Sequence, residues 1–114
     1  MSAVLIVDDE PAICELIANV MRSAGWQAIC AANGQQAASA LEASSGRIDL
    51  ILTDLAMPIM DGLQLIGLVR SLYPGIRIVC MSGCPDRVPP GVAFLHKPFT
   101  VLKLLTAIRG YHTA

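Results

Sequence analysis

The stretch IDLILTDLAMPIMDG, residues 48–62, decides the fold of this chain. Its apolar beginning is too short for a helix and is bounded by loop residues, which is typical of a strand buried on both faces. Asp54 comes where that strand ends, and Asp61 is a suitable N-cap for the apolar helix that follows. Open α/β sheets bind their ligands at the carboxyl ends of the strands. We therefore expect Asp54 to face a functional site.

Strand and helix patterns alternate along the rest of the chain. Apolar runs predict strands at residues 3–7, 26–31, 48–52, 76–81 and 92–95. Helical spacing and end signals predict helices at residues 11–24, 34–45, 62–72 and 101–109. The last helix is expected to place its apolar residues on one face: Val101, Leu104, Leu105 and Ile108. This alternation predicts an α/β fold, a parallel sheet with right-handed crossovers and helices on both faces.

The size, charge and hydropathy of the chain restrict its function. With 114 residues it is long enough for one domain, residues 1–114, and too short for two. The net charge of −1, with scattered lysines and arginines, provides no basic surface for nucleic acid. No apolar run approaches the roughly 20 residues that cross a bilayer, so we expect no membrane segment and a cytoplasmic protein. Charged residues make up only 15%, and we therefore expect some apolar surface to contact a partner.

The four cysteines lack the spacing of metal ligands. Cys14, Cys30 and Cys80 fall inside apolar segments, and Cys84 falls in a loop. We expect buried free thiols at the first three positions, rather than a disulfide or a metal site.

Polar residues follow four of the predicted strands. Parallel strands end at the same edge of a sheet, so these residues should gather there: Asp8, Asp9, Asp54, Ser82 and Lys97. Carboxylates held this close repel one another unless a cation lies between them. Mg²⁺ suits such a site, because it keeps several waters and readily shares a phosphate oxygen.

A carboxylate in this setting is also a phosphoryl acceptor, and it would form an aspartyl phosphate. Transfer needs positive charge near the phosphoryl oxygens, which the metal and Lys97 would supply. The hydroxyl of Ser82 would donate to a third oxygen. The sequence therefore predicts phosphoryl chemistry at this edge.

The chain resembles the receiver domains of two-component response regulators. The motifs that carry the resemblance run nearly end to end: VDDE at 7–10, DLAMPIMDG at 54–62, MSG at 81–83 and FLHKPF at 94–99. The last two motifs are also similar to the receivers attached to hybrid sensor kinases. The resemblance implies a flavodoxin-like, doubly wound fold whose five parallel strands follow the order 2-1-3-4-5.

The resemblance also implies residue roles. Asp54 matches the phosphoacceptor, Asp8 and Asp9 match the acidic pair that holds Mg²⁺, and Ala56 matches the position whose backbone carbonyl reaches the metal.

Further matches concern the conformational switch. Ser82 and Lys97 match the residues that bind the phosphoryl group, and the bond between Lys97 and Pro98 matches one that is cis in the family. Phe94 matches an aromatic that turns inward on activation, although a plain core role on the fifth strand is equally compatible with its sequence.

The segment GCPDRVPPGVA, residues 83–93, departs from the family. Receivers normally have a helix here, but Pro85, Pro89 and Pro90 forbid a regular one. We expect the fourth helix of the family to be missing or reduced to a loop. Its loss should uncover apolar surface near the fourth and fifth strands, and this surface would suit a partner or a homodimer.

Three functions are compatible with these residues. The first is a phosphoacceptor domain, not an enzyme in its own right, that is phosphorylated by a histidine kinase or a phosphotransfer protein. The second is a pseudo-receiver that serves as an interaction or dimerisation module. The third, a phosphohydrolase, ranks last because the chain has no cap domain. The presence of every expected site residue favours the first.

Overall fold

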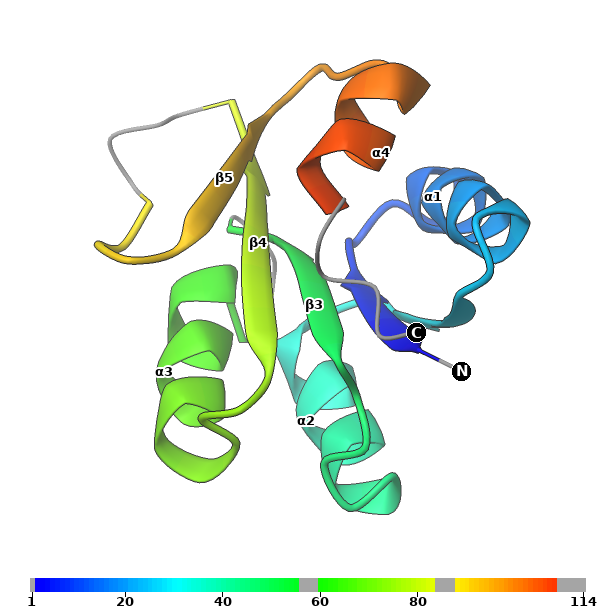
Figure 1. Cartoon of the computed structure of the whole chain (residues 1–114). Coiled ribbons are helices and arrows are strands. Elements are labelled where there is room, and N and C mark those ends of the chain that lie inside the picture. The colour runs from blue at the N-terminus through cyan, green and yellow to red at the C-terminus, as the bar shows by residue number, and fades with distance from the viewer. Residues whose placement is uncertain (1, 56–59, 84–87, 109–114) are drawn as a thin grey trace.

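A parallel sheet forms the centre of the protein, with helices on both of its faces (Figure 1). The computed structural model describes residues 2–55, 60–83 and 88–108, which contain five strands and four helices. The strands are β1 (Ala3–Val7), β2 (Gln27–Ala31), β3 (Leu50–Asp54), β4 (Arg77–Ser82) and β5 (Ala93–His96). The helices are α1 (Pro11–Ser23), α2 (Gly34–Ala43), α3 (Gly62–Leu72) and α4 (Val101–Ile108). The strand order β2-β1-β3-β4-β5 confirms the predicted flavodoxin-like topology.

The central strands are apolar on both faces because helices cover both. Helices α1 and α4 lie over one face, and α2 and α3 lie over the other (Figure 1). Ile6 and Leu52 point to the first face and join a cluster with residues of α1 and α4. Leu5 and Ile51 point to the second face and join a cluster with residues of α2 and α3. Successive side chains of a strand alternate in this way, so continuous apolar runs become strands buried on both sides.

Local signals set the starts of the helices. Pro11 begins α1, where its missing N–H costs nothing. The side chain of Asn33 accepts a hydrogen bond from the backbone of Gln36 and caps α2. Asp61 and Gln64 form a reciprocal capping box at the start of α3, which confirms the predicted N-cap. These local signals fix the residue at which each of the three helices begins.

Several predicted bounds differ from those of the structure. β3 begins at Leu50, two residues later than predicted, and the side chain of Asp49 just before it accepts a hydrogen bond from the N–H of Ala3. β4 and β5 both end one residue later than predicted. On α4, Leu104 and Ile108 are buried as expected, but Val101 is 52% exposed because it lies in the first turn.

The connection between β4 and β5 contains no helix in its described residues, Gly83 and 88–92, which form bends and turns. The expected loop is therefore confirmed for those residues, and residues 84–87 lie outside the described part. The fourth helix of the structure, α4, is the eight-residue helix that follows β5.

The predicted apolar surface beside β4 and β5 is not found among the described residues. Leu55, Ile66 and Cys80 form a buried cluster here, and Val88, Val92 and Phe94 pack against it. The large hydrophobic side chains that are exposed lie on other elements: Leu16, Ile29, Leu63, Leu72, Val101 and Leu102. The prediction of exposed apolar surface at this site was wrong for this part of the chain, because the loop itself supplies apolar cover.

No helix among the described residues has the length and apolar content that spanning a bilayer requires.

Gly62 and Gly67 allow a matched test of how α3 is seated. A Cβ atom at Gly62 would collide with the carbonyl oxygen of Asp54 and lie 2.7 Å from the Cα of Leu55, whereas one at Gly67 meets nothing within 4 Å. We expect Gly62→Ala to lower the free energy of unfolding by about 1–3 kcal/mol, because backbone must move. We expect Gly67→Ala to raise it by about 0.5–1 kcal/mol.

Urea unfolding of both variants measures the difference. Equal effects of the two substitutions would contradict the close seating of Gly62 against the end of β3.

Candidate functional site

The carboxyl ends of the strands bring polar side chains to one edge of the sheet. Asp8 directly follows β1, Asp54 ends β3, and Ser82 ends β4. Lys97 follows β5, and its N–H donates to the carbonyl of Ser82 over 2.8 Å, which extends the pairing of β4 and β5 to the lysine. The N–H of Asp8 donates in the same way to Ala31 at the end of β2. Backbone hydrogen bonds therefore hold the site residues at this edge.

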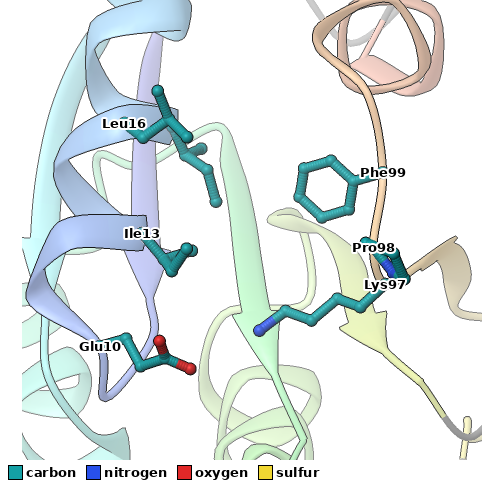
Figure 2. Close-up of a pocket in the computed structure, with 7 residues that line it drawn as sticks. Glu10, Ile13, Leu16, Lys97, Pro98 and Phe99 are labelled. Carbon is teal, nitrogen blue, oxygen red and sulfur yellow. The ribbon is translucent and has the colours of Figure 1, made fainter.

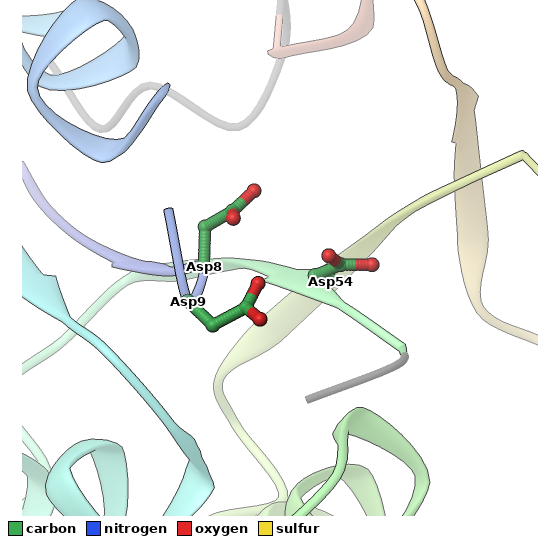
Figure 3. Close-up of side chains that lie close together, drawn as sticks. All are labelled: Asp8, Asp9 and Asp54. Atoms are coloured by element: carbon green, nitrogen blue, oxygen red, sulfur yellow. The ribbon is translucent and has the colours of Figure 1, made fainter. Parts of the chain in front are cut away.

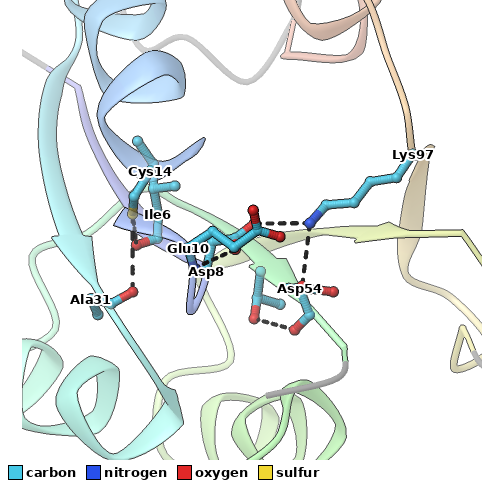
Figure 4. A network of polar contacts seen from close by, with 8 residues as sticks. Ile6, Asp8, Glu10, Cys14, Ala31, Asp54 and Lys97 are labelled. Carbon is cyan, nitrogen blue, oxygen red and sulfur yellow. Dashed lines mark hydrogen bonds and ion pairs between the residues drawn. The ribbon is translucent and has the colours of Figure 1, made fainter. Parts of the chain in front are cut away.

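The ammonium group of Lys97 joins two of the carboxylates (Figure 4). Its Nζ lies 2.9 Å from Oδ2 of Asp8 and 3.2 Å from Oδ2 of Asp54. The Asp8 side chain is fully buried, whereas those of Asp54 and Lys97 are 16% and 25% exposed. The Lys97–Pro98 peptide bond is cis, as the resemblance implied. The lysine therefore points into the site and not toward bulk solvent.

The pKa of Lys97 reflects two opposing influences. Burial, the largest single influence, would lower it, because it disfavours the charged form. The hydrogen bond and charge of Asp8, together with those of Asp54, outweigh burial and raise the pKa above its ordinary value. Lys97 is therefore a fixed positive charge over the whole physiological pH range.

Three carboxylates form an acidic group at the same edge (Figure 3). Oxygen atoms of Asp8, Asp9 and Asp54 all lie within 4.8 Å of one another. Lys97 supplies only one positive charge to three negative ones. The group thus offers hard oxygen ligands and an unbalanced charge of about two, which is what Mg²⁺ requires of a site with few protein ligands. These residues fit a divalent cation.

The remaining predicted site residues have different outcomes. Ser82 is buried at the end of β4, beside the lysine. Ala56 lies outside the described residues. Phe94 is half-buried, packs against the cluster of Leu55, Ile66 and Cys80, and makes an edge contact with the ring of His96. The structure thus gives Phe94 a core position, and its role in a switch stays a prediction.

Sequence reasoning missed an apolar cavity beside the site (Figure 2). It has a volume of about 340 Å³ and lies between α1 and the connection from β5 to α4. Its lining residues are Glu10, Ile13, Leu16, Ile17, Lys97, Pro98 and Phe99. Leu16 lies outside the buried stripe of α1 and is 58% exposed, which only the structure reveals.

Comparisons with known proteins agree with this geometry. The family model described as response regulator receiver domain matches residues 4–109. The sensor kinase CckA of Brucella abortus is 32% identical over 95% of this chain, which spans 12% of that protein. The sporulation initiation phosphotransferase F of Bacillus subtilis is also 32% identical, with 95% and 91% of the two chains covered.

A solved structure extends the likeness to the fold. The response regulator TrrA of Thermotoga maritima, in complex with Mg²⁺-BeF, has a TM-score of 0.85 and 26% identity, covering 98% of this chain and 100% of that one. The present chain spans 24–48% of the transcriptional regulatory proteins that it also matches.

The ion pairs of Lys97 predict a specific effect on stability. Lys97→Met leaves the buried carboxylate of Asp8 without its partner, and we expect the free energy of unfolding at pH 7 to fall by about 1–3 kcal/mol. Because the folded-state pKa of Lys97 is raised, its contribution is complete below the ordinary value of 10.5 and is lost as the pH rises through the folded-state value. Urea unfolding from pH 7 to 11 should show the two proteins converging at the alkaline end.

Lys103, an exposed lysine of α4, provides the control. Lys103→Met should change the unfolding free energy by less than about 0.5 kcal/mol at any pH. A gap between wild type and Lys97→Met that stays constant with pH would argue against the ion pairs as its cause.

Proposed function

The chain belongs to the response regulator receiver domains of two-component systems, and from this premise we propose that Asp54 is its phosphoacceptor. The observation that carries the proposal is the ammonium group of Lys97, which lies between Asp8 and Asp54 within 3.2 Å of both. A fixed cation beside a partly exposed carboxylate is what transfer of a dianionic group requires. No observation on the described residues favours a pseudo-receiver that serves only as an interaction module.

The reaction proceeds through a carboxylate oxygen of Asp54. This oxygen attacks the phosphorus of a phosphohistidine, an oxygen–phosphorus bond forms, and the phosphorus–nitrogen bond breaks. The electron pair of that bond remains on the imidazole nitrogen, which takes up a proton when required. Lys97 turns its ammonium group from the carboxylate of Asp54 to a phosphoryl oxygen, while Asp8 keeps the lysine in place. The hydroxyl of Ser82 donates to another phosphoryl oxygen.

Mg²⁺ would be held by Asp8, Asp9 and Asp54, with the Ala56 carbonyl as a further ligand. When bound, it supplies positive charge that neutralises the phosphoryl oxygens. The support for this assignment is the oxygen-rich acidic group, whose charge Lys97 balances only in part. TrrA, a structural relative, was solved with Mg²⁺-BeF.

The donor is a histidine kinase or a phosphotransfer protein, and we place its contact surface at the apolar cavity beside Lys97. Leu16 and Phe99 border this cavity together with Lys97, which contacts Asp8 and Asp54 (Figure 2). Leu16 is 58% exposed, and an exposed leucine beside an apolar cavity is typical of a surface that a partner buries. A donor that docks here would bring its histidine close to Asp54.

Phosphorylation of Asp54 is tested with a small phosphodonor. In the presence of Mg²⁺ and acetyl phosphate, we expect the intact mass to rise by one phosphoryl group. Asp54→Asn should abolish the increase, because an amide oxygen is a far weaker nucleophile than a carboxylate.

Asp49 provides a matched control. Asp49 directly precedes β3, and Asp54 is the last residue of the same strand. The Asp49 side chain accepts a hydrogen bond from the N–H of Ala3, and the side-chain oxygen of an asparagine would accept it too. Asp49→Asn should be phosphorylated like the wild type. If Asp54→Asn also gains the phosphoryl mass, the acceptor is another residue.

Metal binding is tested at Asp9, which is exposed and outside the contacts of Lys97. We expect Asp9→Asn to weaken Mg²⁺ binding, measured by calorimetry, by about tenfold or more, since one charged ligand is lost. Asp61→Asn should leave the affinity unchanged, because asparagine also caps α3. Equal affinities of wild type and Asp9→Asn would remove Asp9 from the ligand set.

A further inference from the structure

Two cysteines meet between α1 and the edge strand β2. Cys14, on α1, is only 3% exposed, and its Sγ lies 3.4 Å from the carbonyl oxygen of Ile6 and 4.0 Å from that of Ala31 (Figure 4). The Cys14 thiol thus contacts the backbone of both β1 and β2.

The strand register places Cys30 on the same face. Cys30 pairs with Ile6, and paired residues of parallel strands point to the same side of the sheet. Ile6 packs in the cluster that contains Cys14, and so does Ala28, two residues before Cys30. The Cys30 side chain consequently points toward α1, and both cysteines line the same cavity.

The pair is open to small molecules. Cys30 is exposed, contrary to its predicted burial, because β2 is an edge strand. A cavity of about 190 Å³ is lined by both cysteines together with Asp8, Glu15 and Gln36. Within the described residues, the group of three or more metal-ligating side chains whose ligand atoms lie within 4.8 Å of one another is the acidic one, and it contains neither cysteine. Cys14 and Cys30 are thus a separate pair of thiols.

We propose that Cys14 and Cys30 are a modification site that a peroxide oxidises to an intramolecular disulfide. The sulfur of Cys30 attacks the oxygen–oxygen bond of hydrogen peroxide, which gives a sulfenic acid and one water. The sulfur of Cys14 then attacks that of Cys30. The sulfur–sulfur bond forms, and the sulfenic hydroxyl leaves with the proton of Cys14 as a second water.

The environments of the two thiols assign this order. Burial raises the pKa of Cys14 to about 12, and the neighbouring sulfur of Cys30 adds to the increase, so Cys14 stays a neutral thiol until its partner is activated. The exposed Cys30 meets the oxidant first.

The disulfide would lie close to Asp8, a member of the acidic group. Ala31, the residue after Cys30, accepts the hydrogen bond from the N–H of Asp8 over 3.1 Å. A covalent link would tie α1 to β2 at this point and restrict the unfolded chain, so the oxidised protein should melt at a higher temperature than the reduced one. The inference is independent of the phosphoacceptor proposal, because it rests on the placement of Cys14 and Cys30 and requires no phosphorylation of Asp54.

The test uses the full chain with Cys84→Ser, which leaves three thiols. The folded, reduced protein is treated with a small excess of hydrogen peroxide, unfolded, alkylated and digested with trypsin. Before alkylation, we expect the intact mass of the oxidised protein to be two hydrogens lower than that of the reduced protein. After digestion, we expect the peptides of residues 1–22 and 23–47 to be linked by a disulfide. Cys80, fully buried in a separate cluster, should be recovered alkylated.

Two results would overturn the proposal. One is an oxidised or sulfenic Cys30 with Cys14 recovered alkylated, which would show that the sulfurs do not meet. The other is a link that forms only when peroxide is added to unfolded protein. As a further check, Cys14→Ser should leave Cys30 as a sulfenic acid that dimedone traps, and dithiothreitol should return the linked chain to the melting temperature of the reduced protein.

Discussion

The contact of one lysine with two aspartates is the interaction on which the rest of the site depends. Lys97 is 89 residues from Asp8 and 43 residues from Asp54 along the chain, so this contact joins the ends of three strands. Three carboxylates at one sheet edge would repel one another in water-poor surroundings. The ammonium group allows the fully buried carboxylate of Asp8 to stay there, and it does so without closing the edge to an incoming anion. Lys97 therefore serves both the stability of the fold and the chemistry of the site.

The sheet explains why this arrangement arises from such separate sequence positions. Parallel strands with right-handed crossovers all end on one side, so each residue that follows a strand contributes to the same edge. The order β2-β1-β3-β4-β5 puts β1 next to β3, which brings Asp8 beside Asp54 even though a whole helix–strand–helix unit separates them in the chain. The strand order alone therefore places the two acids at neighbouring strand ends.

The sequence was sufficient for the α/β alternation and for the gathering of the acids and the lysine at one edge, because both depend on residue type and on strand ends. The strand order and the inward direction of the lysine came from the resemblance to receiver domains. It was insufficient where burial depends on neighbours. Cys30 sits in an apolar run, but its strand is at the sheet edge and has no neighbour on one side, so its thiol is exposed. The loop before β5 was expected to uncover the sheet, but its residues Val88 and Val92 pack against the cluster of Leu55, Ile66 and Cys80. Such packing could not be deduced from prolines alone.

The loop that takes the place of a helix is also anchored to α3. The guanidinium group of Arg70 donates to the carbonyl oxygen of Pro90 over 2.6 Å, and Gly91 follows in a left-handed conformation. Since that acceptor belongs to the loop, the arginine and the loop form one structural unit although 20 residues separate them. Anyone grafting this short crossover into another receiver would need to transplant Arg70 with it, because the carbonyl group of Pro90 would otherwise lose its donor.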